Sequence, residues 1–195
     1  FPRLRLRLFP LPLPEHEGDQ VGCHHGEHLV FGIPFPEQSH VLVTENADHP
    51  PAEADRRLEQ ARVSARQVLV IWVKLANKGP RGALAEHVGK LQKDKLAVLH
   101  NARARFPNLR IAYLGSRIYG GYASTPLNPE PYAYEGAFAV RRLILDQIKG
   151  DPDLKYDDTN GPAKAPLLMW GPYFWADGTT PRKSDGLIWE RKDLG

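Results

Sequence analysis

From Pro51 onward, apolar residues recur with two alternating periods, one typical of helices and the other of buried strands. Apolar residues at helical spacing predict three helices, over residues 53–63, 83–106 and 134–149. Short apolar runs between and after them predict three strands, over residues 67–73, 109–114 and 166–170. Gly150 and Pro152 are expected to end the last helix, because glycine and proline commonly follow a helix C-terminus.

Each of the two longer helices is expected to bury one face. On helix 83–106 the predicted apolar face consists of Leu84, Val88, Leu91, Val98, Ala102 and Phe106. The charged residues Lys93, Asp94 and Lys95 are expected on the solvent side of this helix. On helix 134–149 the predicted buried stripe consists of Ala137, the aliphatic stem of Arg141, Ile144 and Ile148.

The order of these elements predicts the fold class. Residues 67–73 (QVLVIWV) form a continuous apolar run, which is typical of a parallel strand covered on both faces. Strands separated by helices imply parallel pairing through crossover connections. We therefore predict an α/β fold with an open parallel sheet flanked by helices, and 195 residues with 42% hydrophobic content suffice for one such domain.

The first 50 residues differ in composition from the rest of the chain. Six of the eight histidines and seven prolines lie before Pro51, and no helical periodicity is present there. Short apolar runs at residues 27–31 and 40–44 are both compatible with a strand. The predicted organisation is an irregular Pro/His-rich segment over residues 1–50, which we interpret as foreign to the domain, and an α/β domain over residues 51–195.

The low net charge and the pattern around the single cysteine argue against nucleic-acid, membrane and metal binding. A net charge of +3 is too small to predict binding to nucleic acid or an anionic membrane, and no apolar run has the length of a transmembrane helix. The sequence C-H-H-x-x-H, starting at Cys23, contains metal-ligand residue types. Adjacent ligands rarely reach one ion, however, and the paired C-x-x-C spacing is missing, so neither a metal nor a cofactor is predicted.

The loops that follow the strands are the expected place for a site, because ligands bind beyond the carboxyl ends of parallel strands. Asn77 follows the first of these strands, where its side-chain amide is positioned to donate a hydrogen bond to an oxyanion. An Asx turn or a helix cap before Gly79 is the structural interpretation, and the local sequence by itself favours it.

The next two loops contain candidate binding residues. Gly120 and Gly121 permit a positive φ or the close approach of another backbone, and Tyr119 and Tyr122 flank them as binding surfaces. Arg117 is suited either to clamp a carboxylate or to support the loop. In the loop after the third strand, the residues that form either a platform for a sugar ring or an aromatic plug are Trp170, Tyr173, Trp175 and Trp189.

Other residues in these loops are weaker candidates. Ser116 is rejected as a nucleophile, because it lacks the G-x-S-x-G pattern and precedes a loop instead of a helix. Glu130 and Glu135 could perform acid/base chemistry as a pair. Glu135, however, lies near a helix N-terminus, where the helix dipole favours a carboxylate without any catalytic role. Asp177 and Asp185 each precede glycine, which predicts turns.

Four segments together carry a resemblance to a known family. They are residues 72–80 (WVKLANKGP), 114–123 (LGSRIYGGYA), 128–135 (NPEPYAYE) and 170–173 (WGPY). In these segments the chain resembles bacterial SGNH/GDSL-type hydrolases, over about residues 55–195. The resemblance implies a flavodoxin-like three-layer sandwich and hydrolysis of esters, acylated carbohydrates among them, in a secreted or periplasmic protein. It also implies a serine nucleophile on the first strand and an Asp-x-x-His pair near the C-terminus.

Matched residue by residue, the resemblance is incomplete. Asn77 matches the family's oxyanion-donating asparagine, although Leu75 stands where a glycine is usual. Ser39 is the only serine among residues 1–50 and has no flanking glycines, and Thr180 stands where Asp177 would pair with a histidine. Threonine does not titrate at neutral pH and cannot be the general base. We therefore expect this chain to be a partial domain that lacks the nucleophile, the Asp-x-x-His pair, the first strand and the last helix.

Three functions remain as alternatives. The first is an SGNH/GDSL-type serine esterase domain, catalytically inactive in this chain. The second is a non-catalytic carbohydrate- or protein-binding module on the same fold, which would use the tyrosine and tryptophan loops. The third is metal binding through the N-terminal histidines.

Overall fold

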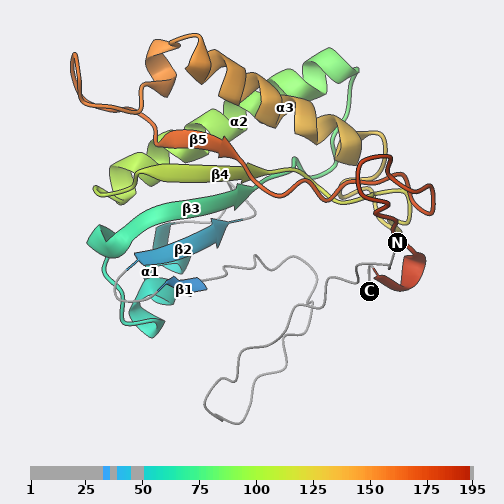
Figure 1. Ribbon diagram of the computed structural model, residues 1–195, viewed down its shortest axis with the longest axis horizontal. Coiled ribbons are helices and arrows are strands. Elements are labelled where there is room, and N and C mark those ends of the chain that lie inside the picture. The colour runs from blue at the N-terminus through green and yellow to red at the C-terminus, as the bar shows by residue number, and fades with distance from the viewer. Residues whose placement is uncertain (1–32, 36–38, 45–50, 194–195) are drawn as a thin grey trace.

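The computed structural model describes residues 33–35, 39–44 and 51–193. Its five strands form one sheet in the order in which they occur in the sequence. The strands are β1 (Ile33–Phe35), β2 (Ser39–Thr44), β3 (Val68–Lys74), β4 (Ile111–Gly115) and β5 (Leu167–Trp170). β1 pairs with β2 in antiparallel orientation, and β2, β3, β4 and β5 are parallel to one another (Figure 1). The predicted α/β class and the parallel pairing are confirmed.

Three α-helices connect the parallel strands. They are α1 (Pro51–Gln60), α2 (Leu84–Arg105) and α3 (Tyr132–Ile148). Single 3-10 turns lie at Ala65–Gln67, Pro152–Leu154 and Arg191–Asp193. All six elements predicted after Pro51 are present within a few residues of their expected bounds. β2 coincides with the apolar run at residues 40–44, which was compatible with a strand. The run at residues 27–31 lies outside the described residues.

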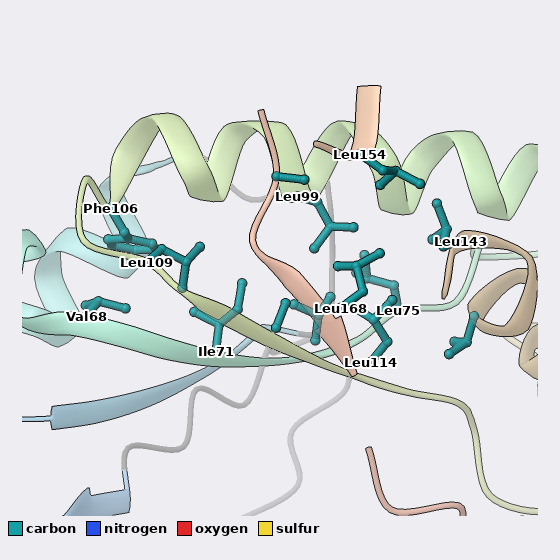
Figure 2. Close-up of a cluster of buried hydrophobic side chains, with 14 of the residues drawn as sticks. Val68, Ile71, Leu75, Leu99, Phe106, Leu109, Leu114, Leu143, Leu154 and Leu168 are labelled. Carbon is teal, nitrogen blue, oxygen red and sulfur yellow. The ribbon is translucent and has the colours of Figure 1, made fainter. Parts of the chain in front are cut away.

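The core lies between one face of the sheet and the three helices. Ile71, Ala112 and Leu168 are adjacent on neighbouring strands and are at most 5% exposed. Leu99 of α2 and Leu143 of α3 pack into the same cluster (Figure 2). The remaining strand and helix residues of this cluster include Leu58, Val73, Leu114 and Val140. Burial of this apolar surface is the main force that holds the helices on the sheet.

The opposite face of the sheet has no helix among the described residues. Trp72 is half-buried on this face, and its indole lies over Gly115 and Gly171, where added Cβ atoms would be 2.8 and 3.2 Å from Trp72 Nε1. On β5, by contrast, Leu167 and Met169 are 36% and 40% exposed. The strand at residues 67–73 was predicted to be covered on both faces. The described helices cover only one of them.

The helix faces differ in part from those predicted. On α3 the buried residues are Ala133, Gly136, Ala139, Val140, Leu143 and Gln147. Ile148, which was placed on the buried stripe, is 74% exposed, and Arg141 is exposed as well. Gln147 lies at a position where an apolar residue would be expected. Its side chain is accommodated there because it bonds the backbone at β5. The amide oxygen accepts from Leu168 N–H at 2.8 Å, and the amide nitrogen donates to Pro166 O, just before the strand, at 3.0 Å.

On α2, the assignment of Lys95 to the solvent side is wrong. Lys95 is fully buried, one turn from Leu91 and one turn from Leu99, and its Nζ has no hydrogen-bond partner among the described residues. Leu84, placed on the apolar face, is 46% exposed, whereas Val88, Leu91 and Phe106 are buried as predicted.

The end of α3 agrees with the prediction. Gly150 lies two residues after Ile148 with a φ of +85°, and its N–H donates to Gln147 O at 3.0 Å, so it ends the helix as predicted. None of the described helices has the length and apolar character needed to cross a membrane.

Candidate functional site

The loops after β3, β4 and β5 meet at one edge of the sheet, where all three strands have their carboxyl ends (Figure 1). Backbone contacts join the first two loops, since Gly79 N–H donates to Leu127 O at 3.0 Å. The third loop contacts the second through Gly178, where an added Cβ would be 3.2 Å from the Tyr119 ring. Residues that are far apart in sequence therefore share one surface at the edge where ligands bind in parallel sheets.

Glu130 connects the second and third loops to the start of α3. Its Oε1 accepts from Gly120 N–H at 2.7 Å and from Trp175 Nε1–H at 2.9 Å. Its Oε2 accepts from Tyr134 N–H at 3.0 Å, which satisfies a free amide in the first turn of the helix. Hydrogen bonds to a carboxylate are stronger than those between neutral groups, so Glu130 fixes the positions of Gly120 and Trp175.

Gly120 is needed at this position because other atoms approach it closely. A Cβ on Gly120 would lie 2.8 Å from the Ala133 Cβ and 2.9 Å from Asn128 O. On Gly121 it would lie 2.1 Å from the hydroxyl oxygen of Tyr119. The close approach expected of the glycine pair is thus present, with the Tyr119 phenol packed on Gly121.

Aromatic rings from three segments form a continuous cluster around these glycines. Tyr119 lies 5.1 Å from Tyr122 and 6.4 Å from Trp175, both in edge-to-face arrangements, and Tyr134 lies 4.6 Å from Trp175. Burial, reinforced by the Asp177 carboxylate, raises the pKa of Tyr119. The phenol therefore keeps its proton at neutral pH and is available as a hydrogen-bond donor.

A small cavity of about 300 Å³ lies beside this cluster. Its lining includes Arg117, Tyr119, Gly120, Tyr122, Asn128 and Arg191. The Arg191 guanidinium lies 5.7 Å from the centre of the Tyr122 ring, and Tyr122 Oη–H donates to Trp189 O at 3.1 Å. Four of the six predicted substrate-binding residues line this cavity, namely Arg117, Tyr119, Gly120 and Tyr122. Gly121 lies against the Tyr119 ring. Trp175 joins them through its contact with Tyr119.

Arg182 shapes the third loop. Its Nη1–H groups donate to Tyr173 O at 2.7 Å and Trp175 O at 3.0 Å, while its other nitrogens bond Asp185. The hydrogen bond from Arg182 holds the pKa of Asp185 well below its usual range. Asp185 therefore serves the loop, and Gly186 turns the chain with a φ of +73°, in agreement with the predicted Asp-Gly turn.

Asn77 lies on the first loop, and its backbone carbonyl accepts from Asn128 Nδ2–H of the second loop at 3.5 Å. Asn77 Nδ2–H donates to Asp94 Oδ2 at 2.6 Å, and the same oxygen accepts from Lys90 Nζ at 2.6 Å. Because a carboxylate can only accept, this contact fixes the orientation of the Asn77 amide. Donation to an oxyanion would require giving up the bond to Asp94 or using the second amide hydrogen, and the catalytic role of Asn77 stays a prediction.

The two glutamates do not act as a pair. Glu130 bonds the loops, whereas Glu135 Oε2 lies 3.1 Å from His87 Nδ1. His87 is 2% exposed and packs edge-to-face on Tyr132, with ring centres 4.9 Å apart. Sequence reasoning missed His87, although its position between Leu84 and Leu91 in the apolar pattern of α2 signals a buried polar residue.

Among residues 54–193, no serine forms a catalytic pair with a histidine. The histidines in this range are His87 and His100, and they bond Glu135 and the Asp153 carbonyl. Ser116 is 5% exposed, and its Oγ has no hydrogen-bond partner among the described residues, consistent with its rejection as a nucleophile. Asp177 forms a turn, since its carbonyl accepts from Thr180 N–H at 2.9 Å.

The described residues contain no group of three or more potential metal ligands. The segment that starts at Cys23, with its neighbouring histidines, lies outside the described residues. Neither family models, curated proteins nor solved structures match the chain.

Proposed function

We propose that the chain is an SGNH/GDSL-type esterase domain that binds an acylated carbohydrate ester at the carboxyl ends of β3, β4 and β5. The proposal includes a second helical layer on the open face of the sheet, which would complete a flavodoxin-like three-layer sandwich. The resemblance of the four sequence segments motivates it. No serine of residues 54–193 is paired with a histidine that could activate it as a nucleophile. We therefore propose that this chain binds the ester without hydrolysing it.

One observation carries the proposal. Glu130 bonds both Gly120 and Trp175 and thereby holds Tyr119, Tyr122 and Trp175 as a preformed surface beside the 300 Å³ cavity. Aromatic rings with polar edges suit the flat apolar face and the peripheral hydroxyls of a sugar. Arg117 and the protonated Tyr119 phenol lie in the same cavity and are suited to bond the carbonyl oxygen of an ester.

A non-catalytic carbohydrate-binding module is the second candidate. It is favoured by the same aromatic cluster together with the bonding of His87 and His100 to groups other than serine. The two functions differ in what they recognise. An esterase-type site selects the acyl group, whereas a simple carbohydrate module selects the sugar alone.

Retention on immobilised acetylated xylan, compared with the same xylan after deacetylation, tests the proposal. We expect at least about tenfold stronger retention on the acetylated form, which corresponds to about 1.4 kcal/mol. Tyr122→Ala and Trp175→Ala should remove most of it, because they delete the binding surface. Tyr156→Ala is the matched control, since Tyr156 is an exposed tyrosine outside the cluster.

Equal retention on both polysaccharides would favour the carbohydrate module. No retention on either one would refute both functions. Covalent labelling by a serine-directed fluorophosphonate would contradict the expectation that the chain lacks a nucleophile.

A further inference from the structure

A second and larger cavity, of about 560 Å³, lies between the loop after β3 and the first half of α2. Its lining includes Leu75, Asn77, Pro80, His87, Leu91 and Asp94. None of the aromatic residues of the proposed ester site lines this cavity, and its size is in the usual range for a small-molecule site. What it can bind is inferred from two buried polar atoms, His87 Nε2 and Asn77 Oδ1, which belong to residues of this lining.

The first of these atoms is Nε2 of His87. The Glu135 carboxylate lies 3.1 Å from Nδ1 and can only accept, so Nδ1 carries the proton. In the neutral ring this leaves Nε2 as an acceptor, and Nε2 is buried without a hydrogen-bond partner among the residues that the structure describes. The His87 ring is held in place, because Tyr132 packs on it and the His87 side chain is only 1% exposed.

The second atom is Oδ1 of Asn77. The Asn77 amide is oriented by Asp94, which accepts from Nδ2 at 2.6 Å. Oδ1 is consequently left as an acceptor, and it too is buried without a partner in the described part of the chain. A buried acceptor that makes no hydrogen bond destabilises the protein, so both atoms favour a ligand that brings hydrogen-bond donors.

We propose that this cavity binds a neutral hydroxyl-bearing ligand of monosaccharide size, whose O–H groups donate to His87 Nε2 and Asn77 Oδ1. Leu75, Pro80 and Leu91 supply apolar surface for the ring face of such a ligand. The charged residues of the lining are of both signs, with Lys78, Arg81 and Lys90 beside Glu86 and Asp94, so a neutral ligand fits better than an ion. This inference goes beyond the proposed function and does not depend on the binding of an ester.

The experiment follows the imidazole nitrogens of the ¹⁵N-labelled full chain by NMR. The probes are the methyl glycosides of galactose, glucose and xylose, and the same glycosides with every hydroxyl methylated. We expect the His87 resonances of the free protein to show the Nδ1–H tautomer. At least one methyl glycoside should then shift Nε2 saturably, and its methylated form should bind at least about tenfold more weakly because it has no O–H donors.

Substitutions assign the resonances and test the geometry. His87→Gln should abolish the saturable shift of backbone amides around the cavity, whereas His100→Gln, on the same helix, should leave it unchanged. Glu135→Gln should admit the Nε2–H tautomer, because a neutral amide can accept from Nδ1 or donate to it. If His87→Gln does not fold, the tautomer of His87 and the glycoside titration of the unsubstituted chain still test whether the cavity binds such a ligand.

Three results would overturn the inference. They are an Nε2–H tautomer in the unsubstituted protein, no saturable shift with any of the three glycosides, and equal binding of hydroxylated and methylated probes. The outcome is independent of the ester site, because retention on acetylated xylan through Tyr122 and Trp175 should be unaffected by His87→Gln.

Discussion

A charged side chain inside the core is the least expected single residue of this protein. Lys95 is fully buried, and Leu91 and Leu99 lie one turn away from it on either side of the same face of α2. Burial lowers the pKa of Lys95 from 10.5 to about 7, because removal from water disfavours the ammonium form. The folded protein therefore takes up a proton at Lys95 less readily than the unfolded chain does.

This difference predicts how stability depends on pH. Between pH 10.5 and about 7 the unfolded chain binds a proton at Lys95 that the folded protein binds poorly, so the free energy of unfolding should fall as the pH falls through this range. Lys95→Met should remove this loss and raise the free energy of unfolding at pH 7 by several kcal/mol, on the order of 1.4 per unit of pKa shift. Urea denaturation at several pH values measures the effect.

Lys93→Met is the control for this substitution. Lys93 is exposed on the same helix two residues away, and its replacement should change stability by no more than about 0.5 kcal/mol. An equal response of the two variants, or an unchanged pH dependence in Lys95→Met, would show that Lys95 is not buried as a lone amine.

At the scale of single elements, the loop between β4 and α3 depends on the absence of a side chain at Gly120. Gly120→Ala would place a Cβ 2.8 Å from the Ala133 Cβ and 2.9 Å from Asn128 O. We expect a loss of about 1–3 kcal/mol in the free energy of unfolding, because helix and loop must shift apart. Tyr119 and Trp175 should lose their fixed arrangement, which near-ultraviolet circular dichroism detects.

Gly89→Ala, inside α2, is the contrasting variant. Nothing lies within 4 Å of the added Cβ, and alanine restricts the unfolded chain, so this change should stabilise the protein by up to about 1 kcal/mol. A destabilisation by Gly120→Ala no greater than that of an average surface substitution would mean that the loop adapts without cost.

The elements themselves were largely predictable, whereas their contacts were not. Apolar periodicity located every α-helix and strand from Pro51 onward, because the pattern is set by which residues each element buries. The buried face of α3 was misplaced, since Gln147 at a core position bonds the backbone of β5 and Ile148 is left exposed. Such a polar contact between two elements leaves no trace in local hydrophobicity.

The same distinction holds for the candidate sites: their location could be predicted from the sequence, whereas their side-chain contacts could not. Loops at the carboxyl ends of the strands follow from the parallel sheet, so Tyr119, Tyr122 and Trp175 could be predicted as neighbours. The bonds from Glu130 to Trp175 and from Glu135 to His87 join residues 45 and 48 positions apart. Their partners depend on how α2, α3 and the last loop pack together, which a single sequence does not specify.

For the molecule as a whole, the two faces of the sheet are unequal. One face is covered by α1, α2 and α3, while the described residues leave apolar side chains of β5 accessible on the other. Leu168 is 5% exposed, but its neighbours Leu167 and Met169 are 36% and 40% exposed. A strand that is apolar on both faces is typical of a sheet covered on both sides, which supports the second helical layer of the proposed sandwich.

Met169 is the only methionine of the chain and therefore a specific probe of this layer. If the second layer is present, hydrogen peroxide should oxidise Met169 at least about tenfold more slowly in the folded protein than in denaturant, because the thioether is then shielded from solvent. Mass spectrometry of the intact chain measures the rate through the addition of one oxygen atom. A folded-state rate close to that of the denatured chain would show that the face is open to solvent, and would remove the three-layer sandwich from the proposed function while leaving the ester site and the His87 cavity to their own tests.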